Sequence, residues 1–356
     1  MTGVFKSLFE TIGKEQLLEI VEKQELSALC FDAVQQDKSL STKVASNPEA
    51  KQRMYQMLGI SIYMERQYSH YENAVKSLSV FARDNNLRML VLKGYGLSLN
   101  YPIPAHRPCG DIDVYVISSF DDFCNCNYKM LDMAVSEKLG VEVDEGNAHH
   151  SCFEFNGFLV ENHKTVLDPN RHKENKGLNQ LLREEANKGI REVNGVLLPS
   201  ARFYSIHLLA HMASDFTSTG TNLKRLLDWA TFVDYTRKED TVDWDFVFST
   251  ADHYGMLPFL NAINDICVRY LGYNRALFPI RIQMGMEQSF RKQSDNVFAD
   301  LIKDHLQILY PPETNFIYYC WMKGNRFFKN RWKYDMVYKE NFWKSLLRQG
   351  WRHLRR

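Results

Sequence analysis

Two aspartates, Asp111 and Asp113, flank Ile112 at the start of an apolar run that has the pattern of a β-strand. Because side chains of an extended strand alternate between its two faces, this spacing turns both carboxylates to the same side. Two like charges held that close need a cation between them, or a raised pKa for one of them. The spacing therefore predicts a divalent metal site on this strand.

Basic and small residues lie shortly before the aspartates. Lys93 and Gly94 end the apolar run that begins at Leu90, and Arg107 lies three residues before Gly110. Glycine allows an anion to approach the backbone at the start of a following helix, while Lys and Arg side chains bind phosphate oxygens. Lys93, Gly94 and Arg107 are therefore predicted to bind the phosphates of a substrate. A solvated surface charge is the simpler alternative for each of the two basic side chains.

The stretch from Leu90 to Val116, LVLKGYGLSLNYPIPAHRPCGDIDVYV, resembles the nucleotidyltransferases of the DNA polymerase β-like superfamily. It is most similar to a bacterial family whose signature runs Leu-Lys-Gly, Tyr-Pro, Arg and Gly-Asp-hydrophobic-Asp. The similarity continues through VENH (Val160–His163) and HLLAHM to LKRLLDW (Leu223–Trp229), so it covers most of residues 88–235. This resemblance implies a small mixed sheet flanked by helices, two divalent ions and nucleotidyl transfer from an NTP.

In such an enzyme Asp111 and Asp113 would hold two Mg²⁺ ions, with Mn²⁺ as the alternative, and we assign the third metal-binding acid to Glu161. Glu161 shares a strand face with His163, and Glu154 on the same hairpin is the alternative third acid. Two cations about 3.5–4 Å apart can activate a hydroxyl nucleophile, polarise the α-phosphate and stabilise the pyrophosphate that leaves. Asp111, Asp113 and Glu161 are therefore the predicted catalytic residues of a Mg²⁺-dependent nucleotidyltransferase.

The sequence departs from the superfamily pattern after its first predicted strand. The usual pair of small residues is here Gly94-Tyr95, with Gly96 one place later. A bulky tyrosine at this point could change how the backbone approaches a triphosphate. The third acid is also less clearly marked than the first two.

A later helical element, which contains Lys224, Arg225 and Asp228, resembles a part of the family that lies over the sheet. Arg225 and Asp228 are therefore predicted to contact the nucleotide or the acceptor. An ion pair between these two residues on the helix surface is the alternative. The sequence does not rank the two.

Two groups of histidines could suggest zinc. They are His207, His211 and Asp215, spaced four residues apart, and His149, His150, Cys152 and His163 around the predicted hairpin. The first group lacks the Glu of an HExxH motif, so packing is the expected role. In the second group, consecutive histidines on an extended chain point to opposite faces, and soft ligands suit a hard-oxygen site poorly. We therefore expect no zinc site.

The hydrophobic period changes twice along the chain. Residues 1–86 have the period of helices, residues 87–198 shift toward the period of strands, and residues 199–356 are helical again. A helix is expected over about residues 120–138, and Asn156-Gly157 predicts a hairpin turn. Strands are expected at Arg88–Leu92, Ile112–Ile117, Val141–Val143, Cys152–Phe155 and Phe158–Val166. The predicted fold class is α+β, with a nucleotidyltransferase core between an N-terminal helical region and a C-terminal helical domain.

Composition is typical of a globular cytoplasmic protein. The chain has 356 residues, of which 45% are hydrophobic, and its formal net charge of +1 creates no overall field toward nucleic acid or lipid. Its 7 cysteines form no CxxC pairs and are typical of reduced thiols. The N-terminus lacks the apolar stretch of a signal peptide, and no apolar stretch is long enough to span a membrane. We expect a cytoplasmic location.

The C-terminal tail begins at Phe316, and its residues 323–356 hold eleven of the 44 Lys and Arg residues and two of the 43 acidic residues. Aromatic residues alternate with these bases, which suits peripheral contact with an anionic membrane or binding to a nucleic-acid backbone. A helix whose aromatic residues pack on the protein body is the alternative. The tail therefore leaves a nucleic-acid-binding module open as a function.

The acceptor is not identified by the sequence. A sugar, another small molecule, a protein side chain and an RNA end are all compatible with the predicted fold, because fold does not determine substrate. The main alternative to an enzyme is a non-catalytic nucleotide-binding or scaffold protein that retains the fold. Such a protein would bind an NTP without releasing pyrophosphate.

Overall fold

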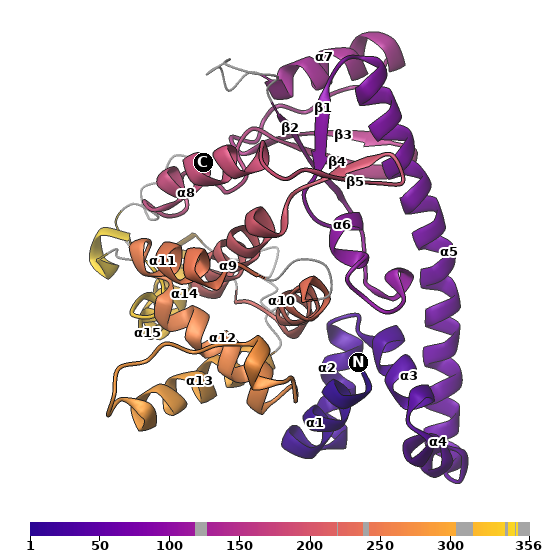
Figure 1. Cartoon of the computed structure of the whole chain (residues 1–356), viewed down its shortest axis with the longest axis vertical. Helices are drawn as coiled ribbons and strands as arrows, with labels where there is room; N and C mark the ends of the chain where they lie inside the picture. The colour runs from indigo at the N-terminus through magenta and orange to yellow at the C-terminus, as the bar shows by residue number, and fades with distance from the viewer. Residues whose placement is uncertain are drawn as a thin grey trace.

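The computed structural model describes residues 1–117, 127–218, 220–237, 242–303, 316–338, 341–345 and 347. Over these residues the chain has the predicted α+β fold, with a six-stranded mixed sheet flanked by helices. The long helix α5 (Pro48–Asp84) runs from the N-terminal helices along one side of the molecule to the sheet (Figure 1). The C-terminal helices lie on the other side.

The N-terminal region is helical, as its sequence period predicts. Asp37 caps one of its helices by accepting from the backbone N–H groups of Ser39 and Leu40, and Asn47 caps α5, which has Pro48 in its first turn. These side chains satisfy backbone donors that a helix start leaves unpaired. The helices before α5 are α1 (Thr2–Ile12), α2 (Lys14–Lys23), α3 (Ser27–Gln36) and α4 (Lys38–Ala45).

The sheet has the strand order β3-β4-β2-β1-β6-β5. Its strands are β1 (Arg88–Val91), β2 (Ile112–Ile117), β3 (His150–Phe155), β4 (Phe158–His163), β5 (Arg191–Val193) and β6 (Val196–Leu198). Strand β2 runs parallel to β4 and β1 runs parallel to β6, whereas the other neighbours are antiparallel. The expected mixed sheet is therefore confirmed.

Two hairpins join pairs of these strands. Asn156 and Gly157 both have positive φ, 49° and 80°, and connect β3 to β4 as predicted. Asn194 and Gly195 adopt the same conformation, with φ of 53° and 79°, between β5 and β6. The sequence prediction missed this second hairpin although its Asn-Gly turn is the same signal.

Other expectations between residues 118 and 199 are corrected. The segment Val141–Val143 forms no strand, and only Asp144 beside it makes a single bridge, with Cys152. Helix α7 (Asn127–Leu139) covers the later part of the predicted helix, whose first residues lie outside the described ranges. Helix α8 (Asn175–Ala186) was not predicted.

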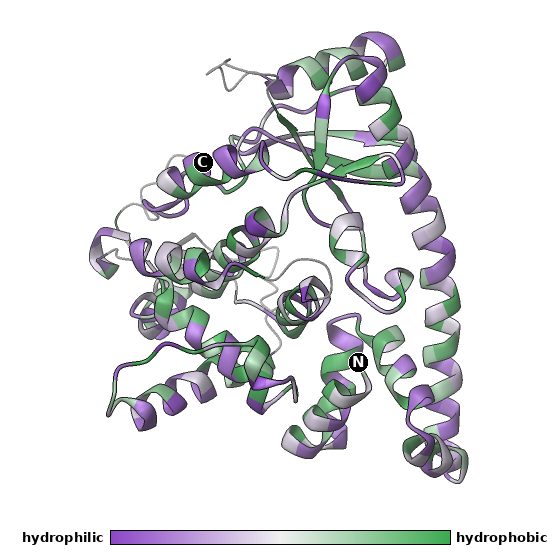
Figure 2. Cartoon of the chain, viewed as in Figure 1, coloured by the Kyte–Doolittle hydropathy of each residue, from purple (hydrophilic) through white to green (hydrophobic). Residues whose placement is uncertain are grey.

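One face of the sheet is apolar and covered by α5 and α7. Figure 2 shows hydrophobic residues gathered along the strands of the sheet. In β2, Ile112, Val114 and Val116 lie in the hydrophobic cluster that includes α5 and α7 side chains, so Asp113 and Tyr115 turn to the opposite face. The cluster also contains Tyr71, Val75, Leu78, Met89, Val91, Leu131, Val135 and Val160. The polar face of β2 is thus directed away from these helices.

The C-terminal region begins with α9 (Ala201–Thr217), a helix that is buried along most of its length. Ser200 caps it by accepting from Phe203 N–H, and Asn222 caps α10 (Leu223–Thr236) by accepting from Arg225 N–H. Tyr204 of α9 donates to the carbonyl of Val91, which ties this region to β1. The remaining longer helices are α11 (Trp244–His253), α12 (Leu257–Arg269), α13 (Glu287–Leu301) and α14 (Phe316–Lys329).

The tail both packs on the body and exposes aromatic residues. Lys333 in the short helix α15 (Arg331–Tyr334) is 1% exposed and pairs with Asp300 of α13. On α14, in contrast, Trp321 is 61% exposed, and Trp343 after α15 is 51% exposed. Within the described ranges, no helix has the length and apolar character needed to cross a bilayer.

Candidate active site

The centre of the candidate site is a pair of carboxylates on two neighbouring strands. Because β2 and β4 are parallel with Asp113 opposite Glu161, the two side chains lie next to each other on the same face. His163, two residues after Glu161, shares that face as predicted. Asp113, Glu161 and His163 each offer one donor atom, and these atoms lie within 4.8 Å of one another. We call these three residues the acid cluster.

Asp113 is 2% exposed, and two donors bind the same oxygen of its carboxylate. Lys93 Nζ lies 2.9 Å and His163 Nε2 lies 2.8 Å from Asp113 Oδ1. Burial acts to raise the pKa of Asp113, but Lys93 and His163 together hold that pKa well below its usual range. The carboxylate is therefore ionised although it is buried.

Glu161 behaves in the opposite way. Burial and the neighbouring Asp113 charge raise its pKa above the usual value, and Asp111 acts in the same direction. His163 partly offsets this rise. The cluster thus contains one carboxylate that is ionised readily and one that is ionised reluctantly, as expected for like charges placed side by side.

Asp111 lies at a bend just before β2 and is exposed. Its charge contributes to the raised pKa of Glu161, but no group of candidate metal ligands in the described chain includes Asp111. Tyr71 of α5 donates to its backbone carbonyl at 3.0 Å. Glu154, the alternative third acid, is exposed near the hairpin turn, where it pairs with Leu159 rather than with Glu161.

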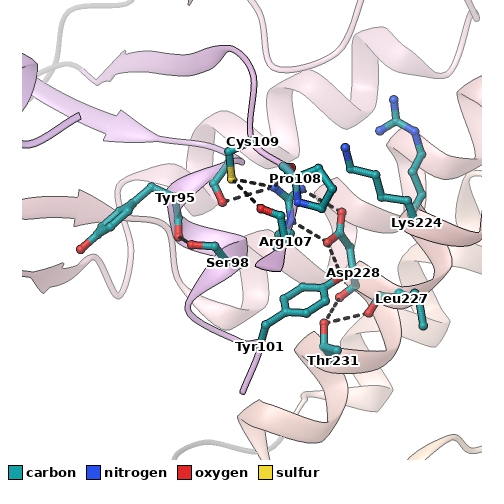
Figure 3. A network of polar contacts seen from close by, with 12 residues as sticks. Tyr95, Ser98, Tyr101, Arg107, Pro108, Cys109, Lys224, Leu227, Asp228 and Thr231 are labelled. Atoms are coloured by element: carbon teal, nitrogen blue, oxygen red, sulfur yellow. Dashed lines mark hydrogen bonds and ion pairs between the residues drawn. The ribbon is translucent and has the colours of Figure 1, made fainter. Parts of the chain in front are cut away.

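Gly94 follows β1 and adopts a positive φ of 51°. A Cβ atom at this position would lie 1.9 Å from Tyr71 Oη, so the close approach of α5 also requires glycine here. The side chain of Tyr95 is buried and contacts Glu72 and Asn194. Figure 3 shows it pointing away from Arg107, so its bulk does not enter the space beside that residue.

Arg107 and Asp228 form a buried ion pair between the segment before β2 and helix α10 (Figure 3). Arg107 Nε lies 2.7 Å from Asp228 Oδ1, and Nη2 lies 2.9 Å from Oδ2, so the guanidinium meets both carboxylate oxygens. Tyr101 Oη donates to Oδ1 at 2.8 Å. We call these three residues the Arg107 clamp. Because Arg107 binds both carboxylate oxygens of Asp228, the alternative Arg225–Asp228 ion pair does not form.

Arg225 instead pairs with Asp215 of α9, with 2.9 Å between Nε and Oδ2. Its Nη1 lies 3.0 Å from His211 Nδ1, and burial together with Arg225 lowers the pKa of His211 to about 4. His207 is buried, and the centre of its ring lies 5.5 Å from that of Phe203 and 6.0 Å from that of His211. A cavity of about 30 Å³ lies between these helices and the segment that follows β1, lined in part by Lys93, Arg107, His207, His211, Arg225 and Asp228.

Comparison with known families places this geometry in context. A family model described as "uncharacterised nucleotidyltransferase" matches residues 10–272. The chain belongs to this nucleotidyltransferase family. The matched segment includes the acid cluster and the Arg107 clamp. No match was found among curated proteins or among solved structures.

This member of the nucleotidyltransferase family also gathers three histidines beside its acids, against expectation. The ring centre of His163 lies 4.8 Å from that of His149 and 5.6 Å from that of His150. The two consecutive rings do not separate because His149 precedes β3 and is not part of an extended strand. Burial lowers the pKa of His149 to about 2, and it also lowers the pKa of His150.

A sequence signal for this convergence was available. A two-residue turn at Asn156-Gly157 fixes the pairing of the strands it joins, and counting back from the turn pairs His150 with His163. The same count places Cys152 opposite Glu161. The hairpin register therefore predicts that His150 lies opposite His163, although it does not place His149.

Proposed function

We propose that this protein transfers a nucleoside monophosphate from an NTP to a hydroxyl acceptor and releases pyrophosphate, with Mg²⁺ as the required ion. The observation that supports this most directly is the alignment of Asp113 with Glu161 on parallel strands, with Asp111 two positions before Asp113 in the chain. Bound divalent ions would polarise the α-phosphate and stabilise the leaving pyrophosphate. Carboxylate oxygens are the ligands that Mg²⁺ and Mn²⁺ prefer, so the donor set fits these ions.

Asp113 and Glu161 would have different roles in catalysis. Asp113 stays ionised inside the protein and would bind Mg²⁺ together with the exposed Asp111. Glu161, whose raised pKa makes it the stronger base of the pair, would assist removal of the proton from the acceptor hydroxyl. Both roles follow from the different surroundings of the two acids on one sheet face.

Lys93, Gly94 and Arg225 would bind the triphosphate. Lys93 already forms a hydrogen bond with Asp113, and both Lys93 and Arg225 line the small cavity. Gly94 follows Lys93 directly in the chain. Arg107 and Asp228 would act on the nucleotide indirectly, because each satisfies the charge of the other. Their proposed role is to position the segment between Gly94 and Asp111 against α10.

The acceptor, the cytoplasmic location and the domain limits at residues 86 and 198 stay predictions. Peripheral membrane contact through the tail is also a prediction, and the exposure of Trp321 and Trp343 supports it. Flotation with anionic liposomes would test this contact, and equal flotation of the intact chain and a chain ending at Pro311 would contradict it.

Pyrophosphate release tests the proposed function. Each NTP would be incubated with the protein and Mg²⁺, across acceptors that represent sugars, other small molecules, peptides and RNA ends. We expect release in at least one combination, its loss in Asp113→Ala and its retention in Asp252→Ala, which changes an exposed residue of α11. Binding of NTP without pyrophosphate release in every combination would instead favour the non-catalytic alternative.

A further inference from the structure

Three histidines, one of which is His163 of the acid cluster, form a second group of possible metal ligands. His149, His150 and His163 each offer one ring nitrogen, and these nitrogens lie within 4.8 Å of one another. Strand pairing places His150 directly opposite His163, and the ring centres of His149 and His150 are 5.5 Å apart. We call these residues the histidine cluster.

His163 has an unused ring nitrogen in a buried position. Its side chain is 3% exposed, and its Nε2 donates to the ionised carboxylate of Asp113. A neutral imidazole that donates through one nitrogen carries a lone pair on the other. That other atom, Nδ1, has no hydrogen-bond partner among the described residues. A histidine held by a carboxylate on one side and free on the other is the usual arrangement of a metal ligand.

His149 is oriented in a similar way. The hydroxyl of Thr165 donates to the carbonyl of Leu167 at 2.9 Å, so its oxygen accepts from His149 Nδ1 at 3.0 Å. The lone pair of His149 is therefore on Nε2. Two of the three rings thus have their tautomer selected by neighbours and keep one nitrogen for another ligand.

His150 needs one adjustment. Asn147 donates to its Nε2 at 2.9 Å, and its Nδ1 lies 3.4 Å from Glu161 Oε2. To offer Nδ1 as a ligand, His150 must exchange its proton from Nδ1 to Nε2, and the amide of Asn147 must turn away. Asn147 is exposed, so such a turn meets little obstruction.

From these contacts we propose that the histidine cluster is a binding site for a transition-metal cation such as Zn²⁺ or Co²⁺. Imidazole nitrogens favour these ions over Mg²⁺, which prefers oxygen. The site lies beside the oxygen ligands proposed for Mg²⁺, and the hydrogen bond between His163 and Asp113 connects the two. The proposal does not depend on nucleotidyl transfer, because it rests on ring contacts and tautomers alone.

Titration of the intact, Mg²⁺-free protein with Co²⁺ tests the proposal, because the visible absorption of Co²⁺ reports nitrogen ligands and coordination number. We expect one equivalent to bind with a nitrogen-ligand spectrum. His149→Ala and His150→Ala should each weaken binding by about tenfold or more. His253→Ala, which removes an exposed histidine of α11, is the matched control and should bind as the unchanged protein does.

Further variants separate this site from the Mg²⁺ site and from general loss of structure. His149→Gln keeps a group that can bond Thr165 but lacks the imidazole, so it should fold normally and still bind Co²⁺ weakly. Asp111→Asn should leave the Co²⁺ spectrum unchanged even if pyrophosphate release is lost. Unchanged Co²⁺ affinity in the folded His149→Gln and His150→Ala variants, or a spectrum with oxygen ligands only, would overturn the proposal.

Discussion

The acid cluster and the Arg107 clamp are both buried and charged, yet they differ in how completely their charges are matched. In the clamp, one guanidinium meets both oxygens of Asp228, and Tyr101 donates a further hydrogen bond. In the acid cluster, Asp113 and Glu161 share one face, and Lys93 forms an ion pair with Asp113 alone of these two acids. The nearby imidazoles of His149 and His150 have lowered pKa values and add no compensating charge.

This difference identifies the Arg107 clamp as a structural ion pair and the acid cluster as a candidate catalytic site. A buried pair with matched charges is costly to break, because removing one partner leaves the other charge without compensation. A cluster with more negative than positive charge can instead bind an added cation. The raised pKa of Glu161 reflects this excess of negative charge, because the neighbouring Asp113 disfavours its ionisation. The clamp is therefore expected to determine stability, and the acid cluster is expected to determine activity.

The largest effect expected is on activity at the acid cluster. Asp113→Asn should lower pyrophosphate release by about a thousandfold or more, because bound metal ions contribute several kcal/mol to such reactions. Thermal unfolding of this variant should change far less than its activity. Initial rates of pyrophosphate release measure the effect, with Asp252→Asn as control. Retention of more than a tenth of the rate would contradict the assignment of Asp113.

The next effect is on stability at the clamp. Arg107→Ala should lower the free energy of unfolding by about 3–5 kcal/mol, because Asp228 stays buried without its partner. Urea denaturation measures this loss. Arg53→Ala, which breaks an exposed pair with Glu49, should cost less than about 1 kcal/mol.

A double-mutant cycle sharpens the clamp prediction. Arg107→Ala combined with Asp228→Ala should cost clearly less than the sum of the single changes, since the second removes the charge left by the first. Additive losses would show that the two side chains do not act as a pair.

A smaller effect is expected at Gly94, which lies between the two regions and whose carbonyl faces Arg107 Nη1 at 3.4 Å. Gly94→Ala should cost about 1–3 kcal/mol, because alanine resists the positive φ and its Cβ would meet Tyr71 Oη. Gly94→Ala should cost less stability in a Tyr71→Phe background than in the unchanged protein, because the oxygen that its Cβ meets is gone. An equal cost in both backgrounds would mean that φ alone causes the loss.

The smallest effect expected is a pH dependence with opposite signs at the two acids. The lowered pKa of Asp113 stabilises the fold above the usual value of 3.8, and this contribution is lost as the pH falls below it. The raised pKa of Glu161 stabilises the fold below 4.5, and this contribution is lost as the pH rises through the folded-state pKa.

Glu161→Gln tests that sign. The variant should be more stable than the unchanged protein at pH 7, where ionised Glu161 faces Asp113, and this gain should shrink at pH 4. Urea midpoints at the two pH values measure it, with Glu154→Gln as the control on the same hairpin. A gain that is larger at pH 4 would show that the pKa of Glu161 is not raised.

Much of the acid cluster was predictable because its geometry is local. Alternation along β4 places Glu161 and His163 on one face, and the turn at Asn156-Gly157 aligns β3 with β4. The apolar alternation around Asp113 also predicted β2 with its correct limits. Val141–Val143 shows the limit of such patterns, because the neighbouring β3 is an edge strand and yet only Asp144 makes a bridge to it.

The sequence by itself determined the α+β order of elements, the strand that carries Asp113 and the β3–β4 hairpin. These features depend on neighbours within a few residues, whose sterics and hydrogen bonds are the same in any fold. Only the tertiary structure decided that Arg107 pairs with Asp228, 121 positions away, and that His149 meets His163. A buried charge or ring takes its partner from whichever distant segment packs against it, and that packing depends on the whole chain.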